Sequence, residues 1–174
     1  MRLTNWHVIT GAPCSGKTTV INELEKVGYR VVHEVARAYI DHEIQKGRRL
    51  NQIKADILAF ERRILHEKIK IEASLPENEI IFLDRAVPDS IAYFKFEGLD
   101  SLEPIEKSQA VRYRKIFLFQ RLGFEKDAVR SEDDKIANRL NDLLEKSYQM
   151  LGYEIVQVPL MAVEKRVDFI LKHL

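Results

Sequence analysis

The chain has 174 residues, 45% of them hydrophobic, which is enough apolar material for the core of one compact domain. Its 28 Lys and Arg residues nearly balance its 27 Asp and Glu residues, so the basic surplus typical of nucleic-acid-binding domains is missing. Cys14 has no cysteine partner, and no apolar run is long enough for a membrane span or a secretory signal. We therefore expect one cytoplasmic domain over residues 1–174, with a small diffusible ligand and with neither nucleic acid nor a membrane as partner.

Short apolar runs with strand character alternate along the chain with segments of helical periodicity. The predicted strands lie at 6–10, 29–33, 80–83, 115–119 and 153–158. Helices are predicted over 17–27, from Asn51 as an N-cap to about Pro76 without a break, from Ser131 to about Leu151, and over 162–174. This alternation is typical of an α/β fold with a parallel sheet covered on both faces. In such sheets ligands bind beyond the carboxyl ends of the strands, so the residues after each strand are the candidates for a site.

The residues after the first predicted strand match the phosphate-loop pattern G-x-x-x-x-G-K-[ST] and stand between a strand and a helix, as that loop requires. The glycines let backbone N–H groups converge on phosphate oxygens, Lys17 reaches the β and γ phosphates, and Thr18 ligates Mg²⁺. ATP is the expected nucleotide, and GTP is less favoured because the sequence lacks the Asn-Lys-x-Asp stretch of GTPases. The predicted nucleotide-binding residues here are Gly11, Ala12, Pro13, Cys14, Ser15, Gly16, Lys17, Thr18 and Thr19.

Glu34 and Arg37 follow the second predicted strand and are one helical turn apart. A kinase that phosphorylates a hydroxyl needs a carboxylate to orient that hydroxyl and accept its proton, and Glu34 stands where such a base is required. We expect both side chains to face the acceptor. The alternative is an ordinary surface pair on adjacent helical turns.

Asp84 directly ends the third predicted strand, which matches the acidic residue that holds hydrated Mg²⁺ in P-loop proteins. Arg85 next to it is a candidate contact for substrate or phosphate. Pro88 and Asp89 suit the first turn of a helix, where an acid favours the positive end of the helix dipole. Asp89 is therefore a candidate either for a cap or for a contact in the site.

The segment from Gln120 to Arg130, after the fourth predicted strand, is charged and lacks periodicity, so it is a candidate lid over ATP. Arg121 is expected to bind the nucleotide, and Arg130 to stabilise charge in the transition state, although a solvated loop arginine is the alternative. On the helix predicted from Asn51, Asp56 is a candidate for substrate binding, although most polar residues of this helix are expected on its solvent-exposed face.

Several segments carry a resemblance to a known family. They are the phosphate loop, residues 34–39, residues 82–85 followed by Pro88 and Asp89, Arg130 before Glu132, and residues 151–153 leading to Val158 and Pro159. Together they resemble the NadR-like P-loop ATPase and kinase family, an AAA-type ATPase domain related to ribosylnicotinamide kinases and to nucleoside and nucleotide kinases. The resemblance implies a three-layer α/β/α fold with strand order 2-3-1-4-5. It also implies that Arg130 is a lid arginine and that Glu34 and Asp84 flank acceptor and metal.

These observations predict an ATP- and Mg²⁺-dependent kinase that transfers the γ-phosphoryl group to a nucleoside- or nucleotide-like acceptor. Lys17, Glu34, Asp84 and Arg130 are the expected catalytic residues. The alternative is a regulatory switch that binds and hydrolyses a nucleotide and has no small-molecule acceptor. A homodimer formed through the long helix is left open.

Overall fold

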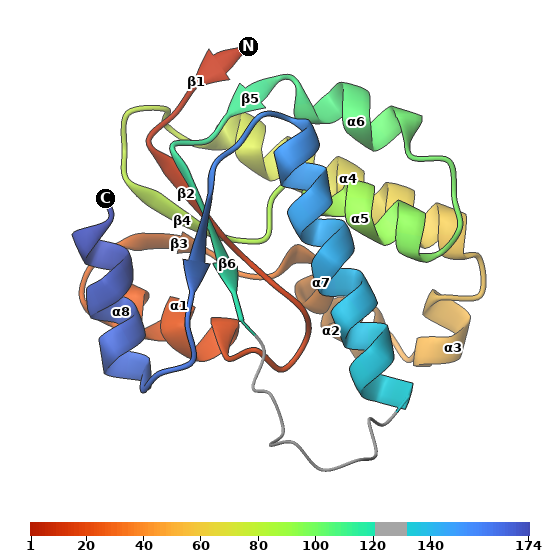
Figure 1. Ribbon diagram of the computed structural model, residues 1–174. Helices are drawn as coiled ribbons and strands as arrows, with labels where there is room; N and C mark the ends of the chain where they lie inside the picture. The colour runs from red at the N-terminus through yellow and green to blue at the C-terminus, as the bar shows by residue number, and fades with distance from the viewer. Residues whose placement is uncertain (121–131) are drawn as a thin grey trace.

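The computed structural model describes residues 1–120 and 132–174, and its centre is a five-stranded parallel sheet (Figure 1). The strands lie in the order β3-β4-β2-β6-β7. Counted among themselves along the chain, they have the order 2-3-1-4-5, which confirms the prediction. Their bounds are β2 (Trp6–Thr10), β3 (Arg30–Val32), β4 (Ile81–Asp84), β6 (Lys115–Phe119) and β7 (Ile155–Val158). A separate pair, β1 (Arg2–Leu3) and β5 (Val111–Arg112), was not predicted.

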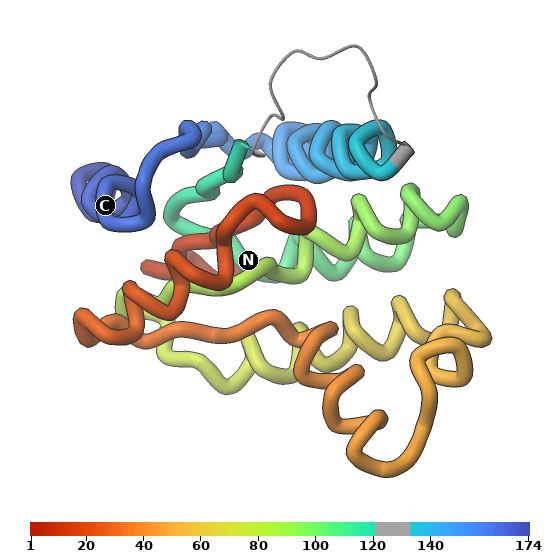
Figure 2. Tube along the Cα trace, turned by 90° about the horizontal axis from the view of Figure 1, so that it is seen from below, coloured from red at the N-terminus to blue at the C-terminus, as the bar shows by residue number. Residues whose placement is uncertain are grey.

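Helices cover both faces of the sheet, as expected for apolar strands that leave no face for water. The helices described are α1 (Lys17–Lys26), α2 (Val35–Gln45), α3 (Leu50–Ile53), α4 (Ile57–Ser74), α5 (Asp89–Phe96), α6 (Leu102–Ser108), α7 (Glu132–Met150) and α8 (Val163–Lys172). On one face α1 and α8 pack against each other; on the other, α5 contacts both α7 and α4, and α4 contacts α2 (Figure 2).

Alternate residues of the central strand enter two different cores. Val8 packs with Leu83 and Tyr148 on the side of α7, whereas Ile9 packs with Ile21 and Ile170 on the side of α1 and α8. Because successive strand side chains point to opposite faces, one buried strand supplies both hydrophobic layers. The predicted three-layer α/β/α architecture is therefore confirmed.

The prediction of one continuous helix from Asn51 is wrong. Arg49 is the N-cap of the short helix α3, which ends at Ile53, and α4 begins afresh at Ile57. Asp56 is extended, and its carboxylate accepts a hydrogen bond from the Ala59 N–H at 2.9 Å. A short acidic side chain that satisfies an orphan N–H favours a helix start over a helix interior, which explains the break.

The predicted N-cap Ser131 and the predicted lid residues Arg121 and Arg130 lie outside the described residues. Within the part of the chain that is described, no helix has the length and apolar character needed to cross a membrane.

Candidate functional site

The phosphate loop connects β2 to α1, and both of its glycines have positive φ angles that would strain any other residue. Gly11 has φ +139°, and a Cβ there would lie 2.8 Å from the Phe119 carbonyl oxygen. Gly16 has φ +84°, and its Cβ would lie 2.8 Å from Nη1 of Arg166. The loop therefore turns directly into α1, whose first backbone N–H groups, including those of Thr18 and Thr19, lack acceptors within the helix. This end of α1 suits a phosphate.

Lys17 lies across the loop and is buried. Its Nζ donates to the Ala12 carbonyl oxygen at 2.9 Å and to the Ser15 hydroxyl at 3.2 Å. Burial, assisted by the nearby Arg85 charge, lowers the pKa of Lys17 to about 8. The Lys17 amine is thus held inside the loop, in the position from which a P-loop lysine meets phosphate.

Two side chains from distant helices hold the same loop. Nη1 of Arg166, on α8, donates to the Ser15 carbonyl oxygen at 2.7 Å, and its guanidinium lies over the Phe119 ring at 5.3 Å. Asn141, on α7, accepts a hydrogen bond from the Ala12 N–H at 3.1 Å. Sequence reasoning missed both residues, because each is a polar position beside the apolar stripe of an amphipathic helix and nothing marks it as different from the wet face.

Asp84 lies at the carboxyl end of β4, beside Ile9 of β2, and is 1% exposed. Its Oδ1 has no hydrogen-bond donor among the described residues, and burial raises the pKa of this carboxyl to about 6. A buried oxygen without a donor fits the oxygen coordination that Mg²⁺ requires, and the Thr18 hydroxyl is a second oxygen at the start of α1. The described residues hold no group of three or more His, Cys, Asp or Glu suited to a metal ion. Mg²⁺ would therefore depend on nucleotide phosphates for further ligands.

Arg85 follows directly and has a left-handed backbone, with φ +68°. Such a conformation costs a non-glycine residue about 1–3 kcal/mol, so the surrounding contacts must impose it. The Arg85 N–H donates to the Ile9 carbonyl oxygen at 3.0 Å, while Nη1 lies 3.5 Å from Oδ1 of Asp89 and the guanidinium lies 5.3 Å from the Tyr93 ring centroid. The turn aims a guanidinium that is 4% exposed into the site.

Asp89 is fully buried and anchors this turn; it is the first residue of α5, whose N-cap is Pro88, so it is not the helix cap, and its burial leaves no exposed surface for a substrate contact. It accepts hydrogen bonds from the Ala86 N–H at 2.9 Å, from the Thr10 hydroxyl at 2.5 Å and from the Tyr148 hydroxyl. These bonds join the end of β2, the turn after β4 and helix α7 beneath the phosphate loop.

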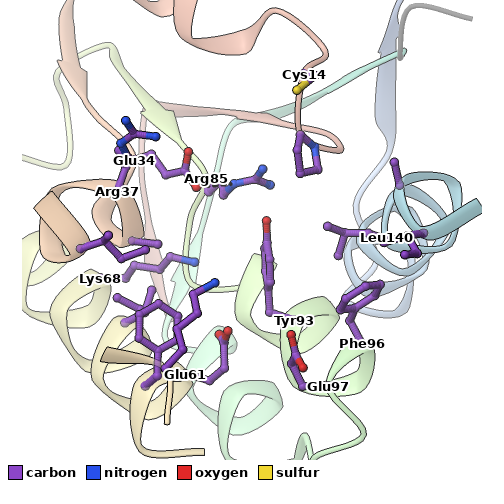
Figure 3. Close-up of a pocket in the computed structure, with 18 of the residues that line it drawn as sticks. Cys14, Glu34, Arg37, Glu61, Lys68, Arg85, Tyr93, Phe96, Glu97 and Leu140 are labelled. Carbon is purple, nitrogen blue, oxygen red and sulfur yellow. Dashed lines mark hydrogen bonds and ion pairs between the residues drawn. The ribbon is translucent and has the colours of Figure 1, made fainter. Parts of the chain in front are cut away.

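Glu34 and Arg85 come from different strand ends and point toward each other (Figure 3). The Nε of Arg85 lies 3.3 Å from Oε1 of Glu34, whose side chain is 32% exposed. Arg37 instead pairs with Asp41 at 3.2 Å and is 76% exposed, so it reaches only the rim of the site. The alternative of a surface pair between Glu34 and Arg37 is not what the structure shows.

A cavity of about 660 Å³ opens beside Glu34 and Arg85 and extends away from Pro13 and Cys14 of the phosphate loop (Figure 3). Helices α2, α4, α5 and α7 form its walls, and Asp56, a predicted substrate residue, is not among the residues that line it. Sequence reasoning missed six polar residues of its lining, because they lie in or beside helices and no motif marks them: Lys54, Glu61, Lys68, Tyr93, Glu97 and Asp133.

Comparisons with known proteins agree with this geometry. The profile of an AAA domain family matches residues 6–166. No curated protein matches the sequence. Among solved structures, NadR protein in complex with NAD and AMP-PNP is similar with a TM-score of 0.69 and 18% identity, over 97% of this chain and 49% of that one. This chain thus spans about half the length of NadR.

Two further solved structures match over nearly the full length of both chains. Thymidylate kinase from Ehrlichia chaffeensis has a TM-score of 0.67 at 14% identity, with 99% of each chain covered. Deoxyadenosine kinase from M. mycoides has a TM-score of 0.63 at 16% identity, with 97% of each chain covered. At these identities the likeness establishes a shared fold.

Proposed function

The chain belongs to this AAA domain family, and from that premise we propose that it is an ATP- and Mg²⁺-dependent kinase of a nucleoside- or nucleotide-like small molecule. The observation that carries the proposal is the convergence of Glu34 and Arg85 at the boundary between the phosphate loop and a cavity of about 660 Å³. A switch that only hydrolyses a nucleotide needs no such cavity. Its volume lies within the usual range for small-molecule sites, roughly 300–1,000 Å³.

The proposed roles follow the position of each group. Lys17 and the backbone N–H groups of the loop bind the β and γ phosphates, and Thr18 and Asp84 would hold Mg²⁺, which neutralises phosphate charge when bound. The acceptor hydroxyl oxygen attacks the γ-phosphorus, the bond to the bridging oxygen of ADP breaks, and Glu34 takes the hydroxyl proton. Arg85 holds Glu34 and meets the transferred group. Arg130 and Arg121 keep their predicted lid roles.

The similar kinases support the choice of acceptor class. Thymidylate kinase and deoxyadenosine kinase share this fold along their whole length, and deoxyadenosine kinase was solved with dCMP, dCTP or dATP bound. We therefore propose nucleosides and nucleoside monophosphates as the first acceptors to examine.

An acceptor panel tests the proposal. ADP release from ATP and Mg²⁺ is measured with and without each nucleoside or nucleotide, mass spectrometry identifies the phosphorylated product, and GTP replaces ATP in a parallel series. We expect at least one acceptor to accelerate ADP release and to gain one phosphate. If ATP binds but no acceptor raises ADP release above the basal rate, the kinase proposal fails and the hydrolytic switch replaces it.

A further inference from the structure

The cavity has two chemically different ends. The end beside Pro13 and Cys14 carries Arg85 and Glu34, which the proposed transfer uses. At the opposite end, away from Cys14, Figure 3 shows the carboxylates of Glu61 and Glu97. Lys54 and Lys68 also line the cavity, so its lining carries charge of both signs there, and the transfer proposed above uses none of these four groups.

Glu61 is the unusual group at this end. It lies on α4, it is only 6% exposed, and it forms no hydrogen bond or ion pair with any residue that the structure describes. Burial and the nearby Glu97 charge raise its pKa, while Lys68 and Lys54 lower it from a distance. Its oxygens are not among the fully buried polar atoms that lack a partner in the described residues, so they open onto the cavity, where a bound molecule would replace water.

Lys68 does not neutralise this carboxylate by contact. It follows Glu61 by two helical turns on the same side of α4, and its Nζ donates to the Ser90 hydroxyl at 3.3 Å. The negative charges of both Asp89 and Glu61 raise the pKa of Lys68, against the larger lowering by burial. The oxygens of Glu61 therefore keep their capacity to accept hydrogen bonds from a molecule in the cavity.

The walls between the two ends suit a flat ring. Phe60, Tyr93 and Phe96 line the cavity with Ile64 and Leu140, and the Tyr93 side chain points along it toward the phosphate loop (Figure 3). Aromatic and aliphatic side chains bind a heterocycle through its faces, while polar groups at its edge decide which heterocycle is accepted.

We propose that Glu61, with Glu97 beside it, selects an acceptor whose ring edge carries N–H donors or a positive charge. The inference rests on the proposed kinase function, since it places the ring at the far end and the phosphorylated group beside Glu34. An acceptor with a carbonyl or carboxylate at that edge is disfavoured, because it would displace water from the Glu61 carboxylate without donating a hydrogen bond in its place.

Matched acceptors test this selection. Adenosine is compared with purine riboside, which lacks only the amino group, and guanosine with inosine, which lacks only the 2-amino group. An N-ribosylpyridinium compound is compared with its uncharged dihydropyridine form, which separates charge from hydrogen bonding. We expect at least one member with the donor or the charge to be preferred by about 10- to 100-fold in kcat/KM, mostly through KM.

Three variants assign the preference to Glu61. In Glu61→Leu the preference falls to about one and the thermal midpoint does not fall, because a buried unpaired carboxylate has been replaced by an apolar side chain. Glu61→Gln keeps an acceptor oxygen but loses the charge, so the pyridinium preference falls further than the amino-group preference. Glu67→Gln, which alters an ion pair with Arg63 outside the cavity, retains all wild-type preferences.

The outcomes separate the two proposals. If acceptors accelerate ADP release but wild type shows no preference, or Glu61→Leu keeps the preference, the selection by Glu61 is wrong and the kinase function stands. If no acceptor accelerates ADP release, the kinase function fails. Calorimetry of the same nucleosides without ATP then still tests the selection by Glu61, and equal Kd values within every pair would overturn that selection.

Discussion

The phosphate loop and the cavity beside it are built in opposite ways. The loop consists of eight consecutive residues, 11–18, between β2 and α1, with Asn141 and Arg166 bonded to it from α7 and α8. The cavity draws its lining from residues as far apart as Pro13 and Leu140 and from four helices. The comparison indicates that a local sequence pattern identifies the phosphate loop, whereas the cavity arises from the packing of helices that share no motif.

The largest expected effect is at the loop. Lys17→Ala removes the amine that bonds Ala12 and Ser15 and that we propose binds the β and γ phosphates. We expect kcat/KM for ATP to fall by about 1,000-fold or more, because binding and transition-state stabilisation are lost together. Steady-state ADP release measures it. Lys26→Ala, at the exposed end of the same helix, is the control, and equal activity of the two variants would contradict the role of Lys17.

The next largest effect is expected at Glu34, where a substitution should change turnover but not nucleotide binding by the phosphate loop. Glu34→Gln keeps the shape of the side chain but removes the proposed proton acceptor, so we expect kcat to fall by about 100-fold with an unchanged Kd for ATP. Turnover and nucleotide titration are measured on the same preparation. The control is Glu25→Gln, an exposed residue that pairs with His33. A variant that retains full turnover removes Glu34 as the base.

A smaller effect concerns the support of the loop by a distant helix. Arg166→Met retains an apolar stem near Phe119 but leaves the Ser15 carbonyl oxygen without its donor. We expect the KM for ATP to rise by about 5- to 10-fold, in line with the loss of one hydrogen bond worth roughly 1–1.5 kcal/mol. The exposed neighbour Lys165→Met is the control. No change in KM would show that the loop holds its shape without α8.

The last prediction concerns stability, and we expect it to affect turnover least. Glu72 accepts hydrogen bonds from the Tyr113 hydroxyl at 2.7 Å and the Val87 N–H at 3.0 Å. Burial raises the pKa of Glu72 from 4.5 to about 7, so the folded state binds this proton more tightly than the unfolded state does. The stabilisation is complete below about pH 4.5 and is lost as the pH rises to about 7.

Glu72→Gln removes this titration. Relative to the variant, wild type should lose on the order of 3 kcal/mol of unfolding free energy across that window, and the two profiles should run parallel above it. Urea unfolding at intervals from pH 4.5 to 8 gives the unfolding free energy of wild type and of the variant. In their difference the titration of other groups cancels, for example that of His7, whose pKa burial lowers to about 4. A constant difference at every pH would show that Glu72 titrates alike in both states.

The predictable part of the candidate site is the part at the strand ends. Asp84 and Glu34 were identified because each acid directly follows an apolar run, and parallel strands bring their carboxyl ends to one edge of the sheet. Asp56 was misplaced for a related reason: helical periodicity marks an apolar stripe but does not show where a capping carboxylate starts a new helix. Glu61 and Lys68 were missed because helical periodicity alone assigns a polar residue beside that stripe to the solvent-exposed face.

The sequence by itself determined the strands and the phosphate loop, because strand periodicity and the glycine pattern act over a few neighbouring residues, while the strand order followed from the family resemblance. Only the tertiary structure decided that Arg85 bends back between Glu34 and Asp89, that Arg166 reaches the loop from α8, and that Glu61 faces a cavity. The physical reason is separation along the chain: these groups meet only when helices pack on the sheet, and no local pattern records which side of a helix another helix leaves open.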